Sequence, residues 1–186
     1  MKATLLITLA SATACLAGTL TYEGDTTGQP VWNRPLQNGS QPPTSLSLVG
    51  TAVPYQAVGF TVSQFGTYNM KTASLVPPGW DNYAVLFAGD FNATQPLLNA
   101  LIANDDLAPV GIGEAGFAYD LNPGTSYYFV TTGFENTDMG TYRLTIDGPG
   151  NISVVPEPGQ LAMMGLTLLG AGGYAVRRFR ATQTAK

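Results

Sequence analysis

Residues 125–132 read Thr-Ser-Tyr-Tyr-Phe-Val-Thr-Thr. Aromatic and β-branched side chains fill this stretch, and such residues fit the pleated, half-buried surface of a sheet. The preceding Asn122-Pro123-Gly124 has proline and glycine at positions where a β-turn favours them. The stretch is therefore the strongest predicted strand of the chain, and the remaining elements are assigned outward from it.

Further short segments on both sides of this strand have the same character. Gln64-Phe65-Gly66 separates two of them and predicts a hairpin, while residues 82–87 are apolar enough for burial on both faces. Tyr142, Leu144 and Ile146 alternate with polar residues, as in a half-exposed strand. The predicted strands are 20–23, 58–62, 67–72, 82–87, 117–121, 125–132 and 142–147, and only 95–103 has a helical pattern. Short strands with frequent turn residues predict an all-β, antiparallel β-sandwich.

Turn motifs between these strands resemble those of bacterial pre-peptidase C-terminal (PPC)-like domains. The motifs are Trp80-Asp81-Asn82-Tyr83, Gly89-Asp90-Phe91-Asn92, Asn104-Asp105-Asp106, the segment 121–128 and Gly140-Thr141-Tyr142. The resemblance covers roughly residues 55–150. It implies a jelly-roll-like sandwich of the kind attached to secreted enzymes or found alone on surface proteins.

The N-terminus predicts export. Residues 1–17 begin with Lys2, continue with an apolar stretch and end in small residues, which is the order of a secretory signal peptide. We favour cleavage after Ala17, which would leave a mature chain without cysteine. Cys15 leaves lipidation open as an alternative, although Ala12 stands where a lipobox wants an aliphatic residue.

Composition narrows the function of the exported part. The chain has 8 Lys and Arg residues against 12 Asp and Glu residues, and outside the terminal segments the cations are Arg34, Lys71 and Arg143. Such an acidic surface argues against nucleic acid as a partner. The sequence contains no histidine, which excludes histidine-based triads. We therefore expect a non-catalytic domain.

The C-terminal tail has three parts. Two prolines, Pro156 and Pro158, flank Glu157; an uncharged apolar run follows from Leu161 to Val176; and an arginine cluster closes the segment. Counted from the second proline, the run is about 28 Å long as a helix, close to the thickness of a hydrocarbon core. We expect one transmembrane helix at 159–176. A buried C-terminal helix is the alternative, but this run has no polar face.

This order of elements resembles the PEP-CTERM sorting signal of Gram-negative bacteria. The resemblance implies a recognition motif at Val155-Pro156-Glu157-Pro158, a membrane segment, and a basic stop formed by Arg177, Arg178 and Arg180. It further implies processing by an exosortase, an integral-membrane cysteine protease-transpeptidase, after passage through the inner membrane. The extension 181–186 departs from the family, whose members often end closer to the basic cluster.

Two groups of side chains are candidate binding sites. Asn104, Asp105 and Asp106 offer three oxygen-bearing side chains in one loop, with Asp81, Asp90 or Asp138 expected nearby, and such sets bind calcium. The alternative is an Asx-rich turn. An aromatic face for stacking sugars is the second candidate, formed by Trp80, Tyr83, Tyr127 and Tyr128, but strand alternation favours burying half of these rings. Trp32 is expected to cover an open end of the core.

The predicted organisation has four parts. These are a signal peptide (1–17), an N-terminal strand and loop segment (18–54), a PPC-like β-sandwich (55–153) and a sorting signal (154–186). The predicted function is that of an exported surface or extracellular-matrix protein, whose partners are signal peptidase, exosortase and an extracellular polysaccharide. Two alternatives stay open: an adhesive or carbohydrate-binding module, and a single-pass protein that is never processed.

Overall fold

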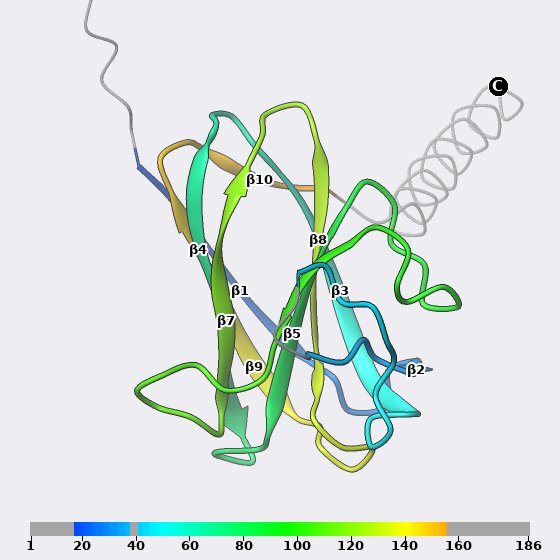
Figure 1. Ribbon diagram of the computed structural model, residues 1–186. Helices are drawn as coiled ribbons and strands as arrows, with labels where there is room; N and C mark the ends of the chain where they lie inside the picture. Colours follow the sequence, from blue (N-terminus) through cyan, green and yellow to red (C-terminus); the bar gives the residue numbers. More distant parts are fainter. Residues whose placement is uncertain (1–16, 38–40, 156–186) are drawn as a thin grey trace, which may run out of the picture.

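The computed structural model describes residues 17–37 and 41–155, and in these ranges the regular elements are all strands (Figure 1). Every strand pairing is antiparallel. The strands are β1 (Gly18–Asp25), β2 (Val31–Trp32), β3 (Val53–Val62), β4 (Gly66–Val76), β5 (Asn82–Ala88), β6 (Ala100–Asn104), β7 (Glu114–Leu121), β8 (Ser126–Gly133), β9 (Thr141–Gly148) and β10 (Ile152–Val155). The predicted all-β, antiparallel class is confirmed.

The strands form two sheets. One has the order β1-β9-β4-β7, and the other has the order β10-β3-β8-β5-β6, with β2 paired to β3 at the edge. Apart from β2 and β10, the pairing is nested: β1 lies against β9, β3 against β8, β4 against β7, and β5 against β6. The N-terminal strand is therefore bound to the last long strand, and the segment before residue 55 belongs to the same folded body.

The main core lies between the two sheets. Tyr142, Leu144 and Ile146 of β9 are fully buried, whereas Arg143 and Asp147 are exposed and Thr145 is intermediate, as the alternation predicted. They pack in one cluster with Phe60 of β3 and Phe129 of β8, the central residue of the stretch 125–132. Burying apolar area of this extent is the main favourable contribution to folding.

A second apolar cluster covers the outer face of the larger sheet. It contains Tyr83, Val85 and Phe87 of β5, whereas Ala84 and Leu86 of the same strand belong to the main core. Trp32, which is 3% exposed, packs on this outer face with its ring 5.6 Å from that of Phe91. Burial on both faces explains the continuous apolar run of β5. Trp32 thus covers a sheet face rather than an end of the core.

Two local predictions are wrong. The segment 64–66 does not form a hairpin, because β3 and β4 belong to different sheets and do not pair with each other. A short break between two strands suits either geometry, and the sequence does not reveal which edges pair. Residues 95–103 do not form a helix. Turns occupy 93–99, with Asn99 at a φ of 63°, and β6 then pairs with β5. Pro96 and the edge of β5 outweigh the weak helical preference there.

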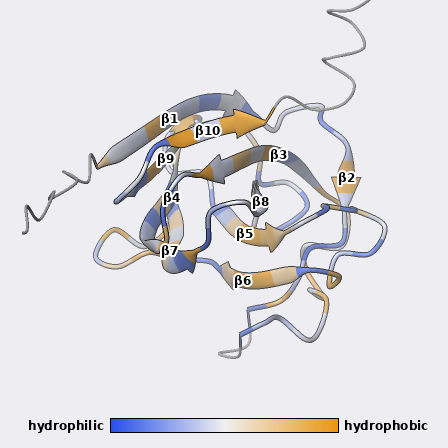
Figure 2. Cartoon of the chain, turned by 90° about the horizontal axis from the view of Figure 1, so that it is seen from above, coloured by the Kyte–Doolittle hydropathy of each residue, from blue (hydrophilic) through white to orange (hydrophobic). Residues whose placement is uncertain are grey.

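The sheet continues to Val155, since β10 pairs with residues 59–62 of β3. It therefore extends two residues past the predicted domain limit at 153. Figure 2 shows β10 as a hydrophobic strand beside β1 and β3. In the part of the chain that the structure describes, no helix has the length and apolar character needed to cross a membrane. The predicted signal peptide at 1–17, the span at 159–176 and the basic stop at 177–180 lie outside the described residues, apart from Ala17.

Candidate functional site

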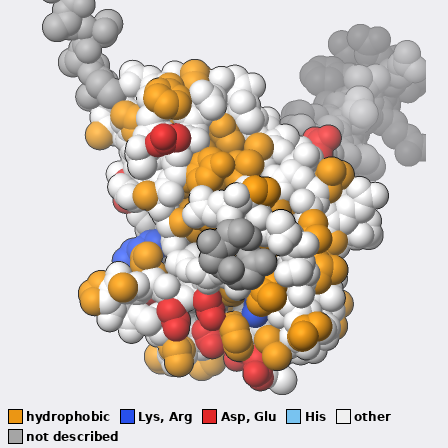
Figure 3. All heavy atoms as spheres, in the orientation of Figure 1, with side chains coloured by type: hydrophobic (Ala, Val, Ile, Leu, Met, Phe, Trp, Pro, Cys, Tyr) orange, Lys and Arg blue, Asp and Glu red, His pale blue; other side chains and the backbone are white. Residues whose placement is uncertain are grey.

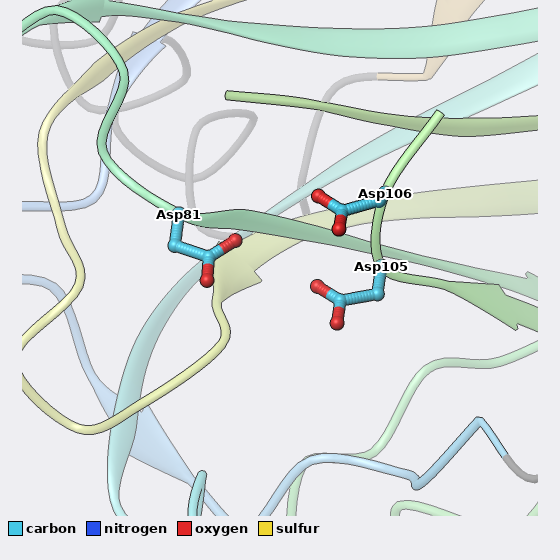
Figure 4. Close-up of side chains that lie close together, drawn as sticks. All are labelled: Asp81, Asp105 and Asp106. Atoms are coloured by element: carbon cyan, nitrogen blue, oxygen red, sulfur yellow. The ribbon is translucent and has the colours of Figure 1, made fainter. Parts of the chain in front are cut away.

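Three carboxylates meet where two paired strands of the larger sheet begin and end. Asp81 directly precedes β5, and Asp105 and Asp106 directly follow β6. Because these strands are antiparallel neighbours, with Ala84 opposite Asn104, the start of one lies beside the end of the other. Figure 4 shows the three side chains directed toward a common centre.

The carboxylates are close enough to share one ion. One oxygen from each of Asp81, Asp105 and Asp106 lies within 4.8 Å of the others. Asp81 and Asp105 are partly buried, and their Oδ1 atoms are enclosed without a hydrogen-bond partner among the described residues. An enclosed carboxylate oxygen without a partner is unfavourable. The cluster is therefore destabilising while all three groups are charged and no cation lies between them.

The electrostatic surroundings raise two pKa values. Burial raises the pKa of Asp81 to about 6, and the neighbouring Asp138 and Asp106 add to this effect. Burial likewise raises the pKa of Asp105 to about 6, with further contributions from Asp81 and Asp106. The charge of Arg34 opposes both shifts. At neutral pH most of these carboxylates are ionised at a cost, which a bound cation would relieve.

Arg34 is the buried cation beside this cluster. Its side chain is fully buried, its guanidinium carbon lies 3.9 Å from the ring centre of Tyr83, and it donates hydrogen bonds to the carbonyl oxygens of Phe134 and Pro35. Gln37 links the same elements. Its backbone N–H donates to Tyr83 Oη at 2.7 Å, and its side-chain oxygen accepts from the backbone N–H of Asp105 at 3.0 Å. The segment before β3 thus anchors the loop that follows β6.

Two of the three predicted calcium ligands lie in the cluster and the third does not. Asp105 and Asp106 lie in the cluster, whereas the amide nitrogen of Asn104 donates to the carbonyl oxygens of Gly116 at 2.6 Å and of Asp106 at 3.3 Å. This amide therefore fixes the loop by donating to backbone carbonyl oxygens, which is not the capping of backbone N–H groups that an Asx-rich turn would provide. Asp90 follows the opposite end of β5 and is not in the cluster. Of the three acids expected nearby, Asp81 completes the set, and the pairing of β5 with β6 is what selects it.

The donor set suits a hard cation. Calcium binds six to eight oxygens at 2.3–2.6 Å, so two oxygens on opposite sides of one ion lie about 5 Å apart. The 4.8 Å limit for these carboxylate oxygens is compatible with that spacing. Acidic side chains also gather near the lower end of the face shown in Figure 3. Residues Asp81, Asp105 and Asp106 would hold the ion, and carbonyl oxygens or water would supply the remaining ligands.

The aromatic residues do not form an exposed platform. Trp80, Tyr83 and Tyr127 are 6%, 1% and 3% exposed, and only Tyr128 of the four predicted rings is partly accessible. The indole N–H of Trp80 donates to the carbonyl oxygen of Thr141, the first residue of β9, and this hydrogen bond holds the ring in place. The three buried rings stabilise the domain and are not available to stack on a sugar, so the predicted aromatic face is reduced to Tyr128.

The fold and the tail together define a class of protein, a β-sandwich domain with a C-terminal sorting segment. Residues 154–180 match the model of the PEP-CTERM protein-sorting motif. This match includes the predicted Val155, Pro156, Glu157 and Pro158 and the three arginines, of which Val155 is described, as the last residue of β10. The motif implies an exported protein that is directed to the cell envelope for exosortase processing.

Comparison with whole proteins adds little. No curated protein matches the sequence. Among solved structures, the K1 cleaved adhesin domain of Lys-gingipain from Porphyromonas gingivalis W83 is similar, with 16% identity, a TM-score of 0.37 and coverage of 74% of this chain and 98% of that one. The K3 cleaved adhesin domain of the same protein has 15% identity, a TM-score of 0.32 and coverage of 69% and 91%. At such TM-scores neither likeness supports a functional argument.

Proposed function

We propose that the chain is an exported, non-catalytic surface protein of a Gram-negative bacterium, and that an exosortase recognises and processes its tail. A signal peptide at 1–17 directs export, and the apolar segment 159–176 halts in the inner membrane ahead of Arg177, Arg178 and Arg180. The exosortase then cuts near 156–158, where Glu157 is the contact residue. The mature domain is released to the cell surface or into an extracellular polysaccharide layer.

The observation that supports this proposal most directly is the sorting-motif match at 154–180. Its position agrees with the limits of the folded domain. The last strand that the structure describes, β10, ends at Val155, and the Pro-Glu-Pro segment follows it directly in the sequence. A processing enzyme at the membrane can therefore cut the tail without unfolding a strand of the main core.

Mass spectrometry of the mature protein tests the proposal. In a host with an exosortase, the wild-type chain is expected to lack the segment that contains the three arginines and to begin at Gly18. The variant Glu157→Gln should keep its tail, while the control Glu135→Gln, at an exposed position in the folded domain, should be processed normally. A wild-type chain that keeps its arginines would contradict processing and support a permanent single-pass tether. A lipid on Cys15 would replace the simple signal peptide with a lipoprotein signal.

The domain itself is assigned as a PPC-like jelly roll. The nested pairing β1–β9, β3–β8, β4–β7 and β5–β6 supports this, since a long antiparallel ribbon rolled into two sheets produces that order. An adhesive or carbohydrate-binding role is the competing proposal. Burial of Trp80, Tyr83 and Tyr127 removes the aromatic platform on which sugar binding was expected to depend. Retention of the purified chain on polysaccharide from its host would restore that role.

A second proposal concerns the acidic cluster, which we assign as a structural calcium site. The enclosed, unpartnered oxygens of Asp81 and Asp105 support it, together with the raised pKa of both groups. Calcium is expected to raise the melting temperature of the full-length chain and to bind with measurable heat. Asp105→Asn should abolish both effects, and Asp90→Asn, which removes an exposed carboxylate elsewhere, should not. Absence of heat and of a thermal shift in the wild-type chain would retire the assignment.

A further inference from the structure

One edge of β3 is open between two short partners. β2 pairs with residues 53 and 54, and β10 pairs with residues 59–62. On this edge the intervening residues 56–58 have no strand partner among the described residues, although β8 pairs with them on the opposite edge. An open stretch of strand edge is a template for one more extended segment.

Hydrogen bonds at both ends of this edge show which residues of β3 direct their backbone groups toward it. Tyr55 N–H donates to the carbonyl oxygen of Pro30 at 3.1 Å, and Ser63 N–H donates to that of Asn151 at 3.0 Å. The register of β3 with β8 is continuous from Tyr55 to Thr61. Since backbone groups of a strand alternate between its two edges, the odd-numbered residues of β3 face the open side. The N–H and C=O groups of Ala57 therefore point into the gap.

A groove accompanies this gap. It has a volume of about 330 Å³, and its walls include Tyr22 of β1, Pro30, residues 55–59 of β3, and Val154 and Val155 at the end of β10. None of the residues that line it is charged. The described part of the chain thus ends at the mouth of an uncharged groove that runs beside an open strand edge.

We infer that this groove binds the chain's own sorting motif, residues Pro156-Glu157-Pro158, as an extension of β10. Val155 lies opposite Gly59, so continuing the antiparallel register places Pro156 opposite Val58, Glu157 opposite Ala57 and Pro158 opposite Gln56. The backbone N–H and C=O groups of Glu157 then face those of Ala57. Both prolines occupy positions whose nitrogen points away from β3, where a strand tolerates proline.

The side chains fit the same register. Val58 and Phe60 of β3 face the main core, whereas Tyr55 and Ala57 face the outer cluster. The rings of Pro156 and Pro158 would lie on the side of Val58 and Tyr22, where the amide of Gln56 is already hydrogen-bonded to the hydroxyl groups of Tyr22 and Tyr142. The carboxylate of Glu157 would lie on the outer side. The segment is also covalently continuous with β10, so its local concentration at the groove exceeds that of any separate peptide.

Docking makes the sorting motif a two-state element. In the docked state its backbone is paired to β3 and is closed to an enzyme that binds an extended substrate, and in the free state it is accessible. This contact belongs to the domain itself and does not require that an exosortase cut the chain. Its test therefore uses no processing step.

Amide hydrogen exchange of the full-length chain in detergent tests the docked state, with Ala57 N–H as the reporter. An alanine inserted after Val155 shifts the motif by one residue and turns both proline nitrogens toward β3, and a two-alanine insertion restores the original alternation. Ala57 is expected to exchange about tenfold faster in the one-residue variant than in the wild type or the two-residue variant. The amides of Tyr55 and Ser63 should be unchanged in all three chains and serve as internal controls. Equal exchange at Ala57 in the three chains, or an unprotected Ala57 in the wild type, would overturn the inference.

Discussion

The acidic cluster leads to an unusual prediction, that removing one carboxylate stabilises the cation-free domain. Asp81→Asn leaves a side chain of the same size and removes one of three charges whose oxygens lie within 4.8 Å of one another. Two unit charges at that distance repel by about 1 kcal/mol in water and by about 3 kcal/mol at the effective dielectric constant near a protein surface. Since Asp81 is partly exposed, solvent screening places the gain near the lower value. A gain of about 1 kcal/mol corresponds to a few degrees in melting temperature.

The two raised pKa values determine how this stabilisation changes with pH. The pKa of Asp81 and that of Asp105 are each about 6 in the folded chain, above the ordinary value of 3.8. The folded state therefore binds more protons than the unfolded state between about pH 4 and pH 6, and the stability of the cation-free chain falls as the pH rises through that window. The advantage of Asp81→Asn should consequently be large at pH 7 and nearly absent at pH 4.

Thermal unfolding followed by circular dichroism measures both effects, on the full-length chain with a chelator, at pH 4 and pH 7. Asp90→Asn is the matched control, because it removes one carboxylate outside the cluster and should shift the melting temperature little at either pH. Excess calcium should reverse the order at pH 7, since only a chain that keeps its ligands gains stability from binding. If Asp81→Asn melts at or below the wild-type temperature in chelator at pH 7, the account of repulsion in this cluster is refuted.

Two further substitutions test the packing that surrounds the site. Arg34→Ala should lower the free energy of unfolding by about 3 kcal/mol or more, because it removes the donor to the buried carbonyl oxygen of Pro35 and to the part-buried one of Phe134. Arg143→Ala removes an exposed ion pair with Glu23 and should cost less than about 1 kcal/mol. Urea unfolding compares the two variants, and equal losses would contradict the structural role of Arg34. Trp32→Ala should cost about 3–5 kcal/mol, while Val31→Ala at the adjacent, 57% exposed position should cost little, and a small loss at Trp32 would show that the outer cluster is not a true core.

Local pattern in the sequence was sufficient for the strands themselves. The alternation of Tyr142, Leu144 and Ile146 identifies one buried face of β9, and the apolar run of β5 correctly indicates burial on both faces. These predictions succeed because side chains alternate between the two faces of a strand, so the pattern can be recognised from neighbouring residues. The sorting motif was recognisable for the same reason, since its three parts follow one another within one segment.

Local sequence pattern did not predict which distant strands pair with each other. The break at 64–66 has the length of a hairpin, yet the strands on either side join different sheets. Asp81 lies far in sequence from Asp105 and Asp106, and the three meet only because β5 pairs with β6 in one particular register. The helical pattern of 95–103 likewise depended on residues whose final conformation is set by the neighbouring strand.

The sequence by itself determined the all-β class, the acidic and histidine-free chemistry of the domain, and the sorting segment at its end, because each depends on composition or on residues close together in the chain. The tertiary structure alone decided which strand edges pair, which carboxylates share a site, and that the groove beside β3 opens where β10 ends. The physical reason is that the pairing of strand edges and the packing of the two sheets depend on how much apolar surface the whole chain can bury. A short stretch of sequence does not contain that information.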